Sequence, residues 1–127
     1  MPQSQTNGIL WTGRILMALW AAFWTWFGLA SGIGEKLSPA GVFMHALIPG
    51  LFFCALLPVA WKWPMAGGIL MAGVAVLVAV AYPALMFRHR PVRWDWYGFI
   101  LLTMALPPLA TGVLLLAGAR RAAHARP

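Results

Sequence analysis

The sequence predicts an all-α protein, with one domain over residues 1–127 that folds as an up-down-up-down antiparallel bundle of four transmembrane helices. Of its residues, 62% are hydrophobic and only 9% are charged, whereas a soluble domain has about 25% charged residues. Four apolar stretches are each long enough to cross about 30 Å of hydrocarbon. Short links join these stretches, which makes consecutive helices antiparallel neighbours.

The predicted spans cover residues 11–33, 39–61, 64–87 and 96–118, with a short polar tail at each terminus. Ser38 and Pro39 suit the start of the second span, because serine caps exposed amides and proline fits the first helical position. Pro64 opens the third span in the same way. Asp95 is placed to cap the fourth span, where a negative charge suits the helix N-terminus. Barrel strands are disfavoured because they alternate apolar and polar residues.

The net charge of +7 indicates contact with the lipid bilayer, since the basic residues flank the apolar stretches where anionic headgroups attract them. Nucleic acid is not an expected partner, because no basic helix face or aromatic platform lies outside the spans. On the side of the termini the basic residues are Arg14, Lys62, Arg120, Arg121 and Arg126, and on the other side they are Lys36, Arg88, Arg90 and Arg93. The positive-inside rule therefore favours a multi-pass inner-membrane protein with both termini in the cytoplasm.

Polar side chains are expected to meet at the face opposite the termini, where the first and third loops lie. The candidate polar cluster consists of Glu35, His45, Arg88, Arg90 and Asp95. Ionisable groups are costly inside a membrane and are therefore candidates for function. Two interpretations of Glu35 stay open: an interfacial ion pair with Lys36, Arg88 or Arg90, and a site that binds a proton or a cation.

His45 and His89 belong to the same predicted face, so a haem held between them is one hypothesis. A hydrogen bond from His45 to a neighbouring helix is the other. The sequence contains no nucleophile–base pair, no phosphate-binding glycine loop and no metal ligands at a recognised spacing. We therefore expect no catalytic residue, no metal and no resident cofactor.

The first span carries two further patterns. Gly28 and Gly32 form a small-xxx-small pair, which allows another backbone to approach closely, either within the bundle or in a partner. Trp20, Trp24 and Phe27 form an aromatic stripe at helical spacing, in a chain with eight tryptophans. This stripe is too deep for the aromatic belt at a membrane surface. It predicts either ordinary lipid and core contact or docking of a lipid tail, quinone, pigment or partner helix.

Three segments resemble a family of small four-helix bacterial membrane proteins that is known only as a domain of unknown function. They are residues 32–35 (Gly-Ile-Gly-Glu), residues 60–70 with a Trp-Lys-Trp turn before paired glycines, and residues 106–112 with Leu-Pro-Pro. The likeness covers about residues 14–118 and implies the fold without an activity. Residues 34–39 (Gly-Glu-Lys-Leu-Ser-Pro) are similar to DoxX-like membrane proteins, some of which are associated with quinone or thiol redox systems.

These features predict a non-enzymatic accessory or structural subunit that acts through helix–helix packing in a larger membrane complex, or through self-association. The alternative is an oligomeric small transporter, or a lipid- or quinone-binding membrane protein, that uses Glu35 and His45.

Overall fold

The computed structural model describes residues 3–88 and 91–124, and every regular element in these two ranges is helical, as predicted. The elements follow one another with few loop residues. They are α1 (Gln3–Gly34), α2 (Pro39–Ala46), the π-helix η1 (Leu47–Leu51), α3 (Phe52–Lys62), α4 (Pro64–Met86), α5 (Trp94–Ile100), the π-helix η2 (Leu101–Ala105) and α6 (Leu106–His124).

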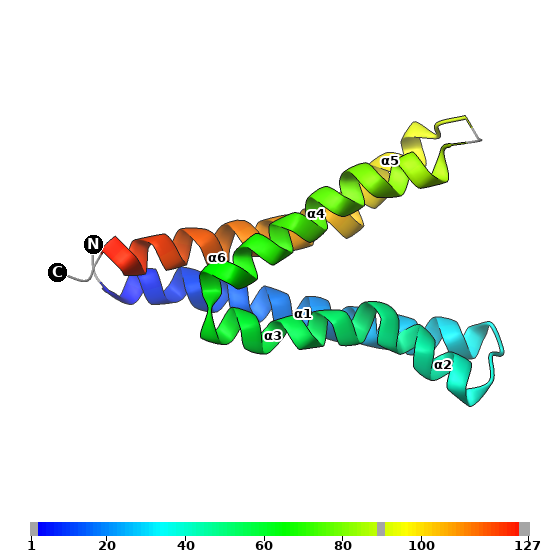
Figure 1. Cartoon of the computed structure of the whole chain (residues 1–127), viewed down its shortest axis with the longest axis horizontal. Helices are drawn as coiled ribbons and strands as arrows, with labels where there is room; N and C mark the ends of the chain where they lie inside the picture. Colours follow the sequence, from blue (N-terminus) through cyan, green and yellow to red (C-terminus); the bar gives the residue numbers. More distant parts are fainter. Residues whose placement is uncertain (1–2, 89–90, 125–127) are drawn as a thin grey trace.

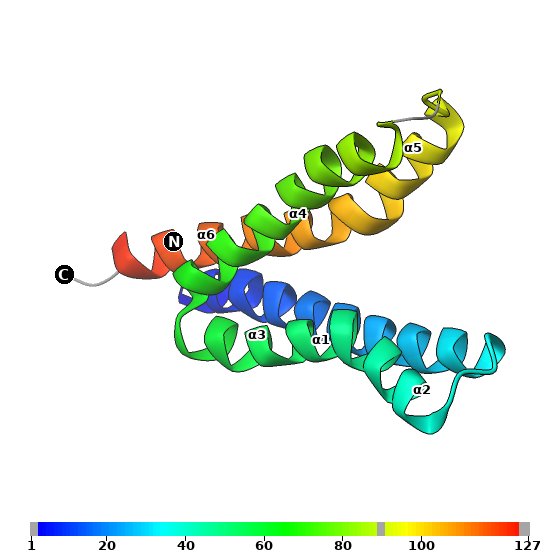
Figure 2. The same ribbon diagram turned by 45° about the vertical axis from the view of Figure 1, so that its right-hand side comes forward.

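These elements form two helical hairpins (Figure 1). The first hairpin pairs α1 with α2, η1 and α3, and the second pairs α4 with α5, η2 and α6. The hairpins pack together near the α3–α4 turn, where α6 contacts α1, and they diverge toward the loops at the other end (Figures 1 and 2). The result is a V with a closed end and an open end. The evenly packed bundle predicted from the sequence is not what the structure shows.

In the part of the chain that the structure describes, three helical segments are long and apolar enough to cross a membrane: Gly8–Gly34, Pro64–Leu85 and Trp94–His124. They are compatible with a small membrane protein. The predicted second span, residues 39–61, consists instead of the short helix α2, the π-helix η1 and the 11-residue helix α3. Four complete spans are therefore not confirmed.

A proline lies in or just after each of the two π-helices. A proline has no N–H to donate, and its ring collides with the carbonyl four residues earlier in an ordinary α-helix. Position 49, within η1, is a proline, and Pro107 and Pro108 follow directly after η2 and Leu106. The wider turn of a π-helix gives these carbonyls room. A proline inside a helix is compatible with a simple kink as well as with a wider turn, so the sequence does not specify the π-helical form.

The buried core lies at the closed end, where α1, α3, α4 and α6 meet. Its fully or nearly fully buried members are Met17, Ala21, Phe53, Leu56, Ala60, Met71 and Leu115. Small residues bring the helix backbones close together here. A Cβ on Gly67 would lie 2.6 Å from the Ala60 Cα, and a Cβ on Gly112 would lie 2.8 Å from the Gly68 carbonyl oxygen.

Arg14 ties α1 to the end of α3. Its Nη2 donates a hydrogen bond to the Trp61 carbonyl at 2.9 Å. Its guanidinium carbon lies 5.8 Å from the Trp11 ring and 5.6 Å from the Trp61 ring, within cation–π range. Trp11, Trp61 and Trp63 are all exposed at this level, as an aromatic belt requires. The closed end therefore has the composition of a membrane boundary.

Candidate functional site

The residues of the predicted polar cluster are divided between the two hairpins. Glu35 and His45 lie at the end of the first hairpin, and Arg88 and Asp95 lie at the end of the second. These two ends are far apart in both views of the V (Figures 1 and 2). Arg90 lies outside the described residues. The cluster was predicted on the assumption that the helices stay parallel to their ends, and the divergence of the hairpins separates its members.

Glu35 does have an ionic neighbour, but it is His45 rather than a lysine or arginine. The Glu35 Oε2 atom lies 3.9 Å from the His45 Nε2 atom, and their side chains are 58% and 45% exposed. A pair this exposed fits an interfacial contact between the end of α1 and α2, where water and headgroups screen its charge. Lys36 continues the chain with a φ of 55°, in the left-handed region that ends α1.

The haem hypothesis gains no support from the described residues. His89 lies outside them, and His45 is placed beside Glu35. Within residues 3–88 and 91–124, no group of three or more His, Cys, Asp and Glu side chains is arranged to hold a metal ion.

Two predicted caps have different outcomes. The Ser38 hydroxyl accepts a hydrogen bond from the Gly41 N–H at 3.2 Å and caps α2, as predicted. The helix after the third loop begins at Trp94, two residues earlier than predicted, so Arg93 is its N-cap and Asp95 lies in its first turn. The Arg93 Nη2 atom donates to the Asp95 carboxylate at 2.6 Å, and this contact raises the pKa of Arg93. Asp95 therefore does not act as the cap.

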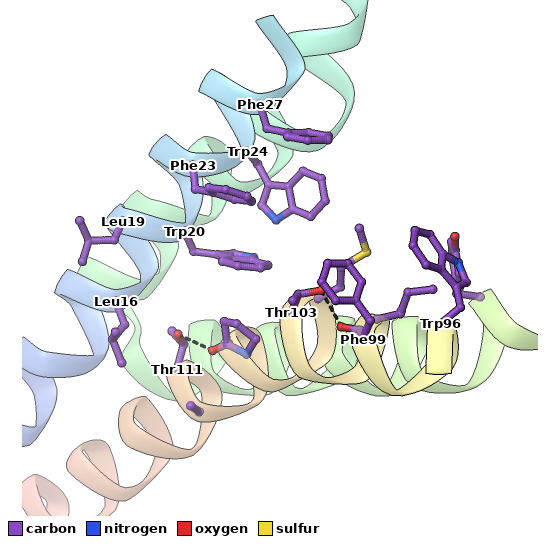
Figure 3. Close-up of a pocket in the computed structure, with 15 residues that line it drawn as sticks. Leu16, Leu19, Trp20, Phe23, Trp24, Phe27, Trp96, Phe99, Thr103 and Thr111 are labelled. Carbon is purple, nitrogen blue, oxygen red and sulfur yellow. Dashed lines mark hydrogen bonds between the residues drawn. The ribbon is translucent and has the colours of Figure 1, made fainter. Parts of the chain in front are cut away.

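A cleft of about 690 Å³ lies between the two hairpins and is the main candidate site (Figure 3). Such a volume is within the range of ligand sites, about 300–1,000 Å³. One wall comes from α1 and contains Leu16, Leu19, Trp20, Phe23, Trp24 and Phe27. The other comes from the second hairpin and contains Tyr82, Trp96, Phe99, Ile100, Thr103, Met104, Pro107, Ala110 and Thr111.

The aromatic rings of the α1 wall support one another and point toward the second hairpin (Figure 3). Phe23 stacks on Trp20 and on Phe27, with ring centroids 5.6 Å and 6.0 Å apart. Trp24 meets each of these three rings edge to face. Phe23 and Phe27 are each 45% exposed. The wall is therefore a preformed aromatic surface that no part of the described chain covers completely.

Few polar groups line the cleft. The Thr103 hydroxyl donates to the Phe99 carbonyl at 2.7 Å, and the Thr111 hydroxyl donates to the Pro107 carbonyl at 2.9 Å. The indole Nε1 atoms of Trp20 and Trp24 are buried and have no hydrogen-bond partner within residues 3–88 and 91–124. Among the described residues, none of the side chains that line the cleft is acidic, basic, a histidine or a cysteine. This surface is suited to holding an apolar molecule by contact.

Gly28 and Gly32, the predicted packing pair, are placed inside the first hairpin. A Cβ on Gly28 would lie 2.5 Å from the His45 carbonyl oxygen, and one on Gly32 would lie 2.9 Å from the Val42 Cα. Of the two alternatives left open by the sequence, their position fits packing within the chain. Trp20, Trp24 and Phe27 instead face the cleft.

Sequence reasoning missed the second wall of the cleft. Apart from Tyr82 of α4, its residues recur at helical spacing along α5, η2 and α6, from Trp96 to Thr111. This spacing was the available signal. It was missed because the stripe mixes aromatic, aliphatic and hydroxyl side chains and so does not stand out from an ordinary apolar span.

A protein family described as a domain of unknown function (DUF7670) matches residues 2–126, and the chain belongs to this family. Searches of curated proteins and of solved structures found no match.

Proposed function

We propose that this family member is a non-enzymatic membrane protein that binds a hydrophobic molecule of the bilayer in the aromatic cleft. One observation carries the proposal: the α1 wall presents stacked aromatic rings to a space of about 690 Å³ that no other part of the described chain fills.

Contact energy supports this role. Inside a bilayer, apolar surfaces gain little from escaping water, so association depends on close van der Waals packing. Aromatic side chains provide large contact areas with few rotatable bonds. Phe23 and Phe27 are already held in place by their neighbours. This lowers the entropic cost of binding a ligand.

Photo-crosslinking in intact membranes tests this function. The residue p-benzoylphenylalanine would replace Phe99, which lines the cleft, or Phe43, which is 63% exposed on α2 and lies outside the cleft. We expect a discrete adduct from position 99 and only the bulk-lipid pattern from position 43. Identical adduct patterns at the two positions would exclude a bound molecule in the cleft.

The accessory-subunit role predicted from the sequence is the second candidate. It is favoured by the same aromatic wall, because a row of rings also suits docking of a partner helix. The small-residue pair Gly28 and Gly32 no longer motivates it, since α2 covers both. An adduct between position 99 and another protein chain would support this candidate over a small hydrophobic ligand.

For the transporter alternative, Glu35 and His45 would have to act on the bound molecule. Both lie at the outer end of the first hairpin, and neither lines the cleft. The cleft therefore supports the binding of a ligand, as that alternative requires, but it does not support a role for Glu35 and His45 in this binding.

We propose the inner membrane as the location, with both termini cytoplasmic. The closed end carries Arg14, Lys62, Arg120 and Arg121 without an acidic side chain in the sequence near them. With Arg126, the side of the termini has five basic residues in the sequence, against four on the other side: Lys36, Arg88, Arg90 and Arg93. Because the positive-inside rule counts lysine and arginine, the closed end is the better cytoplasmic candidate.

A further inference from the structure

We propose that the cleft holds an acyl chain of a phospholipid drawn from the leaflet at the open end of the V. This inference rests on the proposed function and names the ligand of the same site.

At the closed end of the V the cleft ends in packed side chains and does not continue through the protein. Met17, Thr111 and Leu115 are at most 1% exposed where α1 and α6 meet. A Cβ added to Gly13 would lie 3.1 Å from the Leu115 side chain, so the two helices are in direct contact beyond the cleft. A partner helix running along the hairpins needs about 30 Å to cross the membrane, and this contact would block it. A molecule that ends inside the membrane would not be blocked.

The dimensions of the cleft suit a chain. Its α1 wall extends from Leu16 to Phe27, a rise of about 16 Å at 1.5 Å per residue. Its second wall extends from Trp96 to Thr111, a rise of about 22 Å on the same basis. A lipid chain anchored at one surface covers half of the hydrocarbon core, about 15 Å, and more when a groove keeps it extended.

The charges at the open end suit a phosphate headgroup. The sequence has only two acidic side chains. Glu35 lies beside His45, and Asp95 is bonded to Arg93. Among the described residues, neither Lys36 nor Arg88 forms a side-chain ion pair, and both are exposed, one on each side of the opening. Basic groups at this depth attract anionic lipid headgroups, by about 1 kcal/mol each.

Native mass spectrometry of the delipidated full chain would test the assignment. The probes would be dioleoyl phosphatidylglycerol and dioctanoyl phosphatidylglycerol, which share a headgroup and differ in chain length. Ala110→Phe would fill the cleft from α6, and Ala84→Phe would add the same ring to an exposed position of α4 that does not line the cleft. We expect one long-chain lipid per wild-type chain, and the same for Ala84→Phe. Ala110→Phe should bind it roughly tenfold more weakly.

The chain-length comparison uses only the wild-type protein, so it stands even if Ala110→Phe fails to fold. Equal affinity for the long and short chains would overturn the acyl-chain assignment, as would equal binding by the two alanine variants. If position 99 crosslinks to a ring-bearing lipid-soluble molecule, the phospholipid assignment fails while the proposed binding function stands. If it crosslinks to another protein, both fail and the accessory-subunit role is favoured. If position 99 gives no discrete adduct at all, the proposed function itself fails.

Discussion

Trp24 lies nearly parallel to Phe53, with an angle of 21° between their rings and 6.5 Å between the centroids. Phe53 is 7% exposed and belongs to the core at the closed end. Trp20 contacts the same ring edge to face, at 6.2 Å. The aromatic wall of the cleft is therefore supported from behind by α3, which joins the stability of the fold to the shape of the site.

Removing the Phe53 ring should lower the stability of the fold and also disturb the arrangement of Trp20 and Trp24 in the cleft wall. We expect Phe53→Ala to lower the free energy of unfolding by about 3–5 kcal/mol, the usual cost of truncating a buried phenylalanine. Phe43→Ala is the matched control, because Phe43 is 63% exposed. Thermal unfolding in detergent would measure both. Equal losses of stability would show that Phe53 has no special role.

Gly28 tests how the small-residue pair is used. Because a Cβ at this position would lie 2.5 Å from the His45 carbonyl oxygen, Gly28→Ala should push α2 away from α1 and lower the melting temperature. Gly73→Ala is the control, since nothing lies within 4 Å of a Cβ there, and alanine favours a helix over glycine by about 1 kcal/mol. The prediction fails if Gly28→Ala changes only the oligomeric state and leaves the melting temperature unchanged.

Arg14 should stabilise the closed end through its shape as well as its charge. Arg14→Gln removes the hydrogen bond to the Trp61 carbonyl and the contacts with two indole rings, at an expected cost of about 1–2 kcal/mol. Arg14→Lys keeps the charge but not the planar group, so it should recover only part of this loss. Urea unfolding in mixed micelles would compare the variants. Full recovery by lysine would reduce the role of Arg14 to charge alone.

Headgroup preference tests the charges at the open end. The double variant Lys36→Gln, Arg88→Gln should lose its preference for phosphatidylglycerol over phosphatidylcholine with the same chains. Two fewer basic groups correspond to about 2 kcal/mol, or roughly thirtyfold in relative affinity. Arg120→Gln, Arg121→Gln at the other end is the control and should keep the preference. If the Arg120→Gln, Arg121→Gln variant lost the preference for phosphatidylglycerol instead, the headgroup would have to lie at the closed end.

Composition and the lengths of the apolar stretches were sufficient to predict an all-helical chain. In lipid, every backbone N–H and C=O group needs a hydrogen-bond partner within the protein, and an apolar stretch of this length provides these partners by forming a helix. The stripe formed by Trp20, Trp24 and Phe27 was also predictable as a special surface, because its depth excludes the aromatic belt. These predictions depend on residues close together in one helix.

The divergence of the hairpins was not predictable in the same way. It accompanies the π-helices η1 and η2, and a proline in a span is compatible with a simple kink as well as with a wider turn. Phe99, Met104 and Ala110 have the same apolar character as lipid-facing residues, so the second wall could be identified only once the helices were placed. The separation of Glu35 from Arg88 has the same cause.

The distance between the hairpin ends is the most direct test of the open cleft. Spin labels on cysteines at Leu37 and Val92, in a Cys54→Ser background and in nanodiscs, would report the distance across the opening by pulsed electron paramagnetic resonance. Labels at Thr12 and Met65 would report the closed end. A clearly longer distance across the opening is the predicted result. Similar distances at the two ends would contradict the V and restore the evenly packed bundle.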